Sequence, residues 1–110
     1  MSLDFSEGTL LLKALADETR VQIIHILSCG ELCACDILSY FDLKQPTLSH
    51  HLGLLEAANL VEVRKEGRWS YYKLNSEGFT HVQAFLTTLA SPSEVCLCKQ
   101  IKPSCCNETK

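Results

Sequence analysis

Three cysteines lie close together in residues 28–36, the stretch SCGELCACD, and a single residue separates Cys33 from Cys35. Thiolate sulfur is a soft ligand that prefers thiophilic metal and metalloid ions to hard cations. The spacing therefore predicts a thiol pair that binds such an ion. The alternative interpretation is that both are small apolar side chains in a core, which is a common role of free cysteine.

The geometry of this pair depends on the element that carries it. Apolar residues spaced for one helical face predict a short helix over residues 32–41. Each residue turns a helix by about 100°, so side chains two positions apart point in nearly opposite directions. We therefore expect one ion to bind both sulfurs only if the start of this helix unwinds or bends, which would disturb the helix that follows.

The composition is that of a globular chain of 110 residues, with 46% hydrophobic and 21% charged residues. We expect one domain over residues 1–91 and a flexible tail over residues 92–110, because helical periodicity ends at Pro92. The sequence predicts neither a membrane span nor a signal peptide. The odd number of cysteines, seven, then predicts reduced thiols in the cytoplasm rather than a disulfide framework.

The pattern of apolar residues predicts a mainly α fold. Helices are expected over residues 6–16, 17–27, 32–41, 45–59 and 76–90, with Asp17 capping the second and Asn59 ending the fourth. Alternating residues around Gly67 predict a β-hairpin over residues 60–74. Helices followed by such a hairpin, or wing, are typical of a winged helix-turn-helix protein.

Charge is distributed unevenly along the chain. Residues 1–43 hold two basic and seven acidic residues, whereas residues 44–73 hold five basic and three acidic ones. The locally positive segment contains the fourth helix and the hairpin. We therefore expect these two elements to bind DNA, although the net charge of the chain is −3.

The fourth predicted helix has an apolar side and a polar side. Leucines form the apolar stripe, His50 lies almost opposite it, and His51 falls nearer to it and should be partly packed. Small hydrogen-bonding groups suit the base edges and phosphates of a major groove. The alternative is a solvated surface without a partner. The predicted DNA-binding residues are Gln45, Thr47, Ser49, His50 and His51 in the helix and Arg64, Lys65 and Arg68 in the hairpin.

Four segments carry a family likeness: ALADETRVQIIHIL, GELCACDIL, QPTLSHHLGLLEAANLV and RKEGRWSYYKLN. Over residues 7–90 the chain resembles the arsenic-responsive repressor (ArsR/SmtB) family of metal-sensing winged-helix proteins. The resemblance implies a homodimer, not an enzyme, that represses arsenical resistance genes by binding double-stranded operator DNA. It also implies that As(III) or Sb(III), without an organic cofactor, binds Cys33 and Cys35 and releases the DNA.

Two patterns within that family are missing from this chain. Some arsenical members carry a third cysteine three residues after the pair, where this sequence has Leu38. The zinc-sensing members use Asp-x-His and a later His on the last helix, whereas here Phe79 stands two residues before His81 and no second His follows. The resemblance therefore favours an arsenical site over a zinc site and leaves the third ligand open.

Trivalent arsenic prefers three sulfur ligands, so the pair needs another thiol. Proximity favours Cys29, which stands at the end of the preceding helix. Cys96 and Cys98 are the alternative, at an entropic cost for ordering the tail, and Cys105 and Cys106 lie farther still. A thiol or water from outside the chain is the remaining possibility.

Three other functions are compatible with parts of the pattern. A cadmium- or lead-responsive repressor of the same family would use the same pair with cysteines near the N-terminus, and none occurs before Cys29. A thiol-rich metal-buffering protein would leave the polar fourth helix unexplained. A thiol oxidoreductase or arsenic reductase would need a Cys-x-x-Cys motif or an activated lone cysteine in an α/β fold, which the sequence does not predict.

Overall fold

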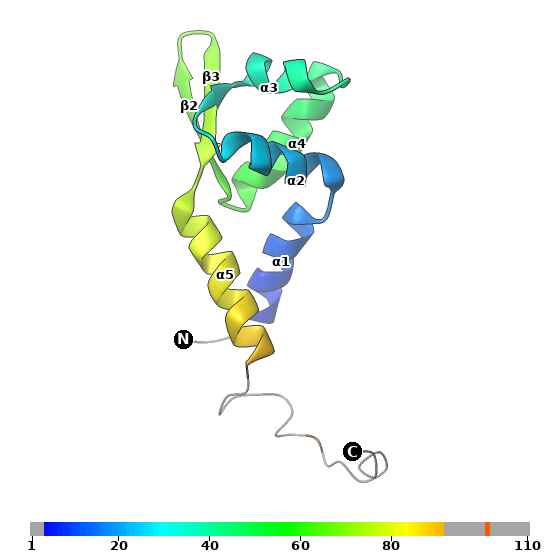
Figure 1. Ribbon diagram of the computed structural model, residues 1–110, viewed down its shortest axis with the longest axis vertical. Coiled ribbons are helices and arrows are strands. Elements are labelled where there is room, and N and C mark those ends of the chain that lie inside the picture. Colours follow the sequence, from blue (N-terminus) through cyan, green and yellow to red (C-terminus); the bar gives the residue numbers. More distant parts are fainter. Residues whose placement is uncertain (1–3, 92–100, 102–110) are drawn as a thin grey trace.

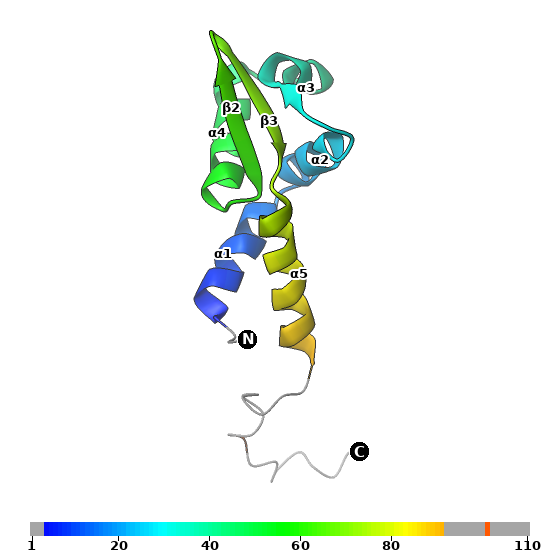
Figure 2. The same cartoon turned by 90° about the vertical axis from the view of Figure 1, so that its left-hand side faces the viewer.

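The computed structural model describes residues 4–91 and 101. Helices α1 (Phe5–Leu15) and α5 (Ser76–Ala90) lie side by side at one end of the molecule. Helices α2 (Glu18–Leu27), α3 (Ala34–Tyr40) and α4 (Gln45–Ala57) lie at the other end with the hairpin (Figures 1 and 2). The four tail cysteines, Cys96, Cys98, Cys105 and Cys106, lie outside the described residues.

The helix ends follow the local signals in the sequence. The Asp17 carboxylate caps α2 by accepting hydrogen bonds from the backbone N–H groups of Thr19 (2.8 Å) and Arg20 (3.2 Å). Asn59 adopts a left-handed backbone with φ of 61° just after α4. Both predicted helix boundaries are confirmed.

A three-stranded antiparallel sheet has the order β1-β3-β2, with strands β1 (Leu32–Cys33), β2 (Val61–Glu66) and β3 (Trp69–Leu74). Strands β2 and β3 form the predicted hairpin, whose two-residue loop contains Gly67 at φ 62°. Strand β1 pairs with the other edge of β3, and Cys33 lies opposite Tyr71.

The prediction of a helix from residue 32 is wrong at its start. Leu32 and Cys33 hydrogen-bond to β3, and α3 begins only at Ala34. The physical reason is that the edge of β3 offers backbone partners from a distant part of the sequence, which apolar periodicity does not reveal. The thiol pair therefore spans a strand and the first turn of a helix.

The core lies between the two ends of the molecule and contains the leucine stripe of α4. Leu48, Leu52 and Leu55 are almost completely buried, as predicted. They pack with buried residues from the other helices, from the turn that follows α4 and from β2, namely Leu11, Ala14, Ile23, Leu27, Ile37, Ala58, Leu60, Val61 and Val82. This packing fixes α4 with its polar side outward.

Gly78 in α5 allows a close approach to the turn after α4. A Cβ atom at this position would overlap the backbone carbonyl oxygen of Asn59. We expect Gly78→Ala to lower the free energy of unfolding by about 1–3 kcal/mol, because backbone must move to relieve the overlap. Thermal unfolding measures this, with Gly53→Ala as the matched helical control, since a Cβ there meets nothing. Equal stability of both variants would contradict the prediction.

Candidate metal centre and nucleic-acid interface

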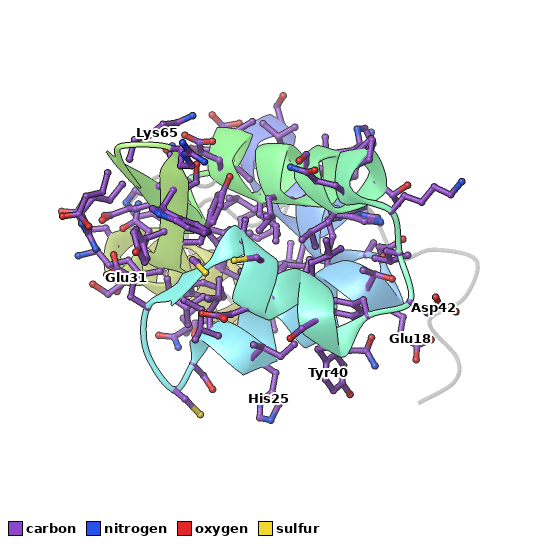
Figure 3. The ribbon with its side chains drawn as sticks, turned by 90° about the horizontal axis from the view of Figure 1, so that it is seen from above. Glu18, His25, Glu31, Tyr40, Asp42 and Lys65 are labelled. Carbon is purple, nitrogen blue, oxygen red and sulfur yellow. The ribbon has the colours of Figure 1, made fainter. Side chains whose placement is uncertain are left out.

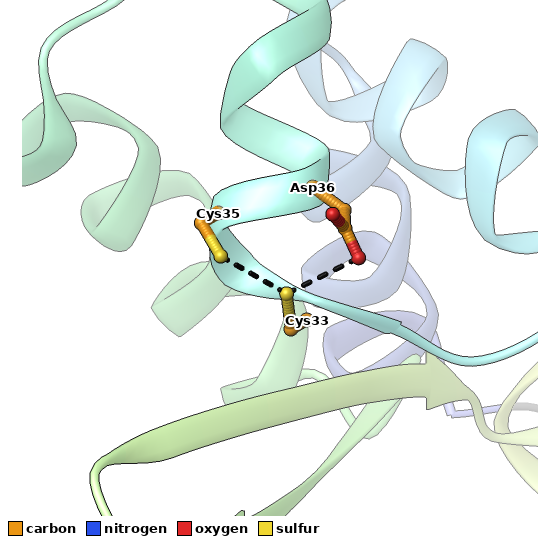
Figure 4. A group of neighbouring side chains, drawn as sticks. All are labelled: Cys33, Cys35 and Asp36. Carbon is orange, nitrogen blue, oxygen red and sulfur yellow. Dashed lines mark hydrogen bonds between the residues drawn. The ribbon is translucent and has the colours of Figure 1, made fainter.

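Cys33, Cys35 and Asp36 form a compact group of candidate ligands where β1 meets α3 (Figure 4). The two Sγ atoms are 3.1 Å apart, and Cys33 Sγ lies 3.2 Å from Asp36 Oδ2. All three ligand atoms lie within 4.8 Å of one another. Cys33 is buried and Cys35 is exposed, so an ion from solvent can reach the pair from the side of Cys35.

The sulfurs are close because Cys33 is not helical. It is the residue before α3 and has an extended backbone, with φ −81° and ψ 161°. This conformation turns its side chain toward that of Cys35, whereas two helical positions would point apart. The expectation that an ion must unwind the helix to reach both sulfurs is therefore wrong, because the sulfurs already lie on the same side.

The surroundings favour a protonated Cys33. A hydrogen bond with the Cys35 thiol raises the pKa of Cys33, and the Asp36 carboxylate, which accepts a hydrogen bond from Cys33, raises it further. Asp36 is not among the ligands that the sequence predicts. The sequence does contain a signal for this contact. Asp36 follows Cys33 by three residues, and at this spacing the side chain of the third helical residue can reach the N-cap residue.

Cys29, the nearest predicted third ligand, is exposed and follows the end of α2. It does not belong to the compact ligand group that the described residues form. Within residues 4–91, the third potential ligand atom beside the two sulfurs is therefore a carboxylate oxygen and not a third thiol.

Helix α4 presents the predicted polar surface. Gln45, Thr47, Ser49 and His50 are exposed. His51 is partly buried, as expected from its place beside the leucine stripe, and its Nδ1 atom lies 3.0 Å from Nη1 of Arg20. Arg20 is not among the site residues that the sequence predicts.

The three basic residues of the hairpin have different surroundings. Arg64 forms ion pairs with Glu31 (2.9 Å) and Glu66 (3.2 Å). Its guanidinium also lies 4.6 Å from the ring centre of Tyr71. Hydrogen bonding by Arg64 holds the pKa of Glu31 below its ordinary value. Arg64 is thereby occupied within the protein.

Lys65 and Arg68 are exposed, and neither forms an ion pair with a described residue. Figure 3 shows Lys65 on the side of the hairpin toward α4 and Glu31 on the other side. Among the described residues, Lys65 and Arg68 are thus unpaired and Arg64 is paired, and the role of all three in DNA binding stays a prediction.

Helices α3 and α4 are joined by a short loop, α4 exposes a polar face, and a basic hairpin follows. This arrangement defines a winged helix-turn-helix protein, a class that places its second helix in the major groove of DNA. Residues 17–63 match the family model described as bacterial regulatory protein, arsR family.

An arsenical resistance operon repressor from Staphylococcus xylosus is 40% identical over 104 residues, covering 94% of this chain and 100% of the relative. The chain therefore belongs to the arsR family of bacterial transcriptional regulators. A cadmium resistance transcriptional regulatory protein homologue from Staphylococcus aureus is 47% identical over 66 residues, covering 59% of this chain and 54% of that protein. These relatives are regulators and not enzymes, in agreement with the sequence analysis.

The fold agrees with a solved relative. The solution structure of a homodimeric winged helix-turn-helix domain from Mycobacterium bovis, a possible ArsR-family regulator, has a TM-score of 0.64 and 30% identity. It covers 77% of this chain and 79% of that domain. The predicted fold class is therefore confirmed. No helix within residues 4–91 is long and apolar enough to cross a membrane.

Proposed function

We propose that this repressor controls arsenical resistance genes in the cytoplasm by binding operator DNA as a homodimer. We further propose that As(III) or Sb(III) binds Cys33 and Cys35 and releases the DNA. The observation that carries the proposal is the pair of sulfurs 3.1 Å apart, placed between the hairpin and the helix-turn-helix. The names of the relatives support the choice of inducer.

A mobility-shift titration tests this function directly. The protein is incubated with DNA from upstream of its own gene, and arsenite, antimonite, cadmium, lead and zinc are added separately. Release by arsenite and antimonite at the lowest concentrations supports the proposal. Release by cadmium or lead alone favours the second candidate, a cadmium- or lead-responsive repressor, for which the cadmium-resistance relative is the motivation.

On the DNA side, we assign base contacts to the exposed α4 residues Gln45, Thr47, Ser49 and His50. We assign phosphate contacts to Lys65 and Arg68, because both cations are exposed and unpaired among the described residues. Arg64 instead holds the hairpin against Glu31, so we give it a smaller share in phosphate binding than the sequence alone predicts.

Salt dependence should separate these basic residues. Arg68→Ala is expected to reduce the slope of log affinity against log salt by about one unit per protomer, because one phosphate contact is lost. Arg64→Ala should change the slope less, because its charge is already paired with Glu31 and Glu66. Operator affinity measured at several salt concentrations gives both slopes. Equal reductions would contradict the division between paired and unpaired cations.

On the sensing side, an ion bound by both thiols would join β1 to the first turn of α3. Cys33 pairs with Tyr71 in β3, so its movement reaches the hairpin, and Cys35 moves with α3 of the helix-turn-helix. The Glu31–Arg64 ion pair forms a second connection between the loop before β1 and the hairpin. We infer that the ion changes the position of the hairpin relative to α4, and that the two DNA-bound elements then no longer fit together.

Asp36 is a hard donor and does not meet the preference of arsenic for sulfur. We propose that its role is to accept a hydrogen bond from the free Cys33 thiol, whose Sγ lies 3.2 Å from Asp36 Oδ2. The third ligand then comes from Cys29, from the tail, or from a thiol or water outside the chain. Cys29 requires a movement of the segment between α2 and β1, since the described structure does not place it in the ligand group.

Proton stoichiometry should distinguish the candidate inducers. Arsenite, As(OH)₃, exchanges each hydroxyl for a thiol and releases water, so no net proton is produced. Cadmium or lead must displace the thiol protons. The Cys33 thiol holds its proton near neutral pH because its pKa is raised. We expect the arsenite response to be nearly independent of pH near neutrality. A cadmium response should strengthen by about tenfold per pH unit for each proton displaced. Equal pH dependence for both ions would contradict this ligand chemistry.

A further inference from the structure

Arg20 connects three parts of the molecule through one guanidinium group. Its Nε donates to the carbonyl oxygen of Ala14 at 2.7 Å, and its Nη2 donates to that of Lys13 at 3.4 Å. Both carbonyls belong to the last turn of α1, and that of Lys13 also accepts a hydrogen bond from the backbone N–H of Ala16. The remaining nitrogen, Nη1, lies 3.0 Å from Nδ1 of His51 in α4.

This contact determines the tautomer of His51. A guanidinium carries only donors, so Nδ1 of His51 has to accept the hydrogen bond with its lone pair. The proton of the neutral imidazole is then on Nε2, at the far end of the ring. Arg20 thus fixes both the orientation of the ring and the identity of the nitrogen that can donate outward.

The position of His51 indicates what that donor meets. His51 lies one helical turn after exposed Thr47, on the flank of α4 between the leucine stripe and the polar face around His50. It is partly buried, so its reach toward base edges is shorter than that of His50. The flanks of a helix inserted in the major groove face the phosphates along the groove edge.

We propose that Arg20 is a positioning residue for DNA binding, which presents Nε2–H of His51 to a phosphate of the operator backbone. The inference rests on the proposed DNA-binding function and assigns a role to a residue outside α4 and the hairpin. The Arg20 side chain also connects the end of α1 to α4, the helix proposed to read the DNA.

Two substitutions at His51 separate its two nitrogens. His51→Asn keeps an acceptor near Nδ1 for Arg20 and loses the outward donor, so operator affinity should fall by about tenfold per protomer. His51→Gln keeps a donor near Nε2 and should retain most of the affinity. The loss in His51→Asn should be the same on operator and on unrelated DNA, since a phosphate carries no sequence information.

A double-mutant cycle tests the role of Arg20. Arg20→Met keeps the apolar stem and removes the guanidinium, and it should lower DNA affinity by a smaller factor than His51→Asn, because a part of the His51 rings keeps the proton on Nε2. Combined with His51→Asn, it should cause no further loss of affinity. If Arg20 only stabilised the end of α1, the loss would be equal in both backgrounds, and the proposal would be overturned. Thermal unfolding, measured in parallel, identifies the temperature range in which all variants are folded.

The tautomer itself provides a readout that a purely structural role would not change. Nitrogen-15 NMR of the free protein, at a pH where the imidazole is neutral, should show His51 protonated at Nε2, and Arg20→Met should mix the two tautomers. A His51 protonated at Nδ1 in the wild type would overturn the assignment. If the wild-type protein failed to bind any DNA, the proposed function would fail, and the tautomer result would stand independently.

Discussion

Cys33→Ser and Cys35→Ser proteins should bind operator DNA with wild-type affinity and should not be released by arsenite. Serine is similar in size and leaves the β1–α3 junction intact, but its hydroxyl is a poor ligand for a soft ion. Coupling of this kind changes DNA affinity by about 5–150-fold in typical allosteric proteins. Either substitution should reduce that factor to about one, because a single remaining thiol cannot join β1 to α3.

Fluorescence anisotropy of labelled operator, titrated with arsenite, measures this loss. Ala34→Ser introduces the same side chain between the two cysteines without removing a thiol, and this control should retain the response. The Cys29→Ser protein and a chain ending at residue 91 then test the third sulfur separately. Whichever loses sensitivity as completely as Cys33→Ser identifies the source of the third ligand. A Cys33→Ser protein released at the wild-type arsenite concentration would refute the assigned site.

The second large effect concerns the surface formed by α1 and α5. Leu86 and Leu89 in α5 remain 44% and 46% exposed, and Leu12 in α1 remains 37% exposed. The two helices lie side by side at the end of the molecule away from the hairpin (Figure 2), and both carry exposed apolar side chains. The homodimeric relative supports the proposal that a second copy of the chain covers this surface.

We expect Leu86→Glu combined with Leu89→Glu to give a folded monomer. Burying two carboxylates in an apolar interface is costly, whereas their exposure on the isolated chain is not. Binding through one half-site should then be about 10²–10⁴-fold weaker than binding of the dimer to the full operator. Analytical ultracentrifugation and operator affinity measure the two consequences.

Val21→Glu is a matched control for this pair of substitutions, because Val21 is also 49% exposed but lies in α2. It should leave the dimer and its operator affinity unchanged. A dimeric Leu86→Glu, Leu89→Glu protein that binds like the wild type would place the subunit interface elsewhere. Circular dichroism confirms that each variant is folded.

Local signals in the sequence determined most of the fold. The Asp17 cap, the Asn59 stop, the leucine stripe of α4 and the turn at Gly67 each depend on a few neighbouring residues, and the structure confirms all four. The Cys-x-Cys spacing likewise indicated soft-ion chemistry, because the choice of ligand atoms depends on residue type.

Tertiary contacts decided how those residues are arranged. Cys33 is extended because β3, far away in the sequence, supplies its backbone partner, and this pairing brings its sulfur to that of Cys35. Arg64 is paired because it contacts Glu31, and α3 and α4 separate these two residues in the sequence. Arg20 likewise reaches His51 only because α1, α2 and α4 pack together. Periodicity and charge describe short windows of a chain, whereas these three contacts join windows that only the packed core brings within hydrogen-bonding distance.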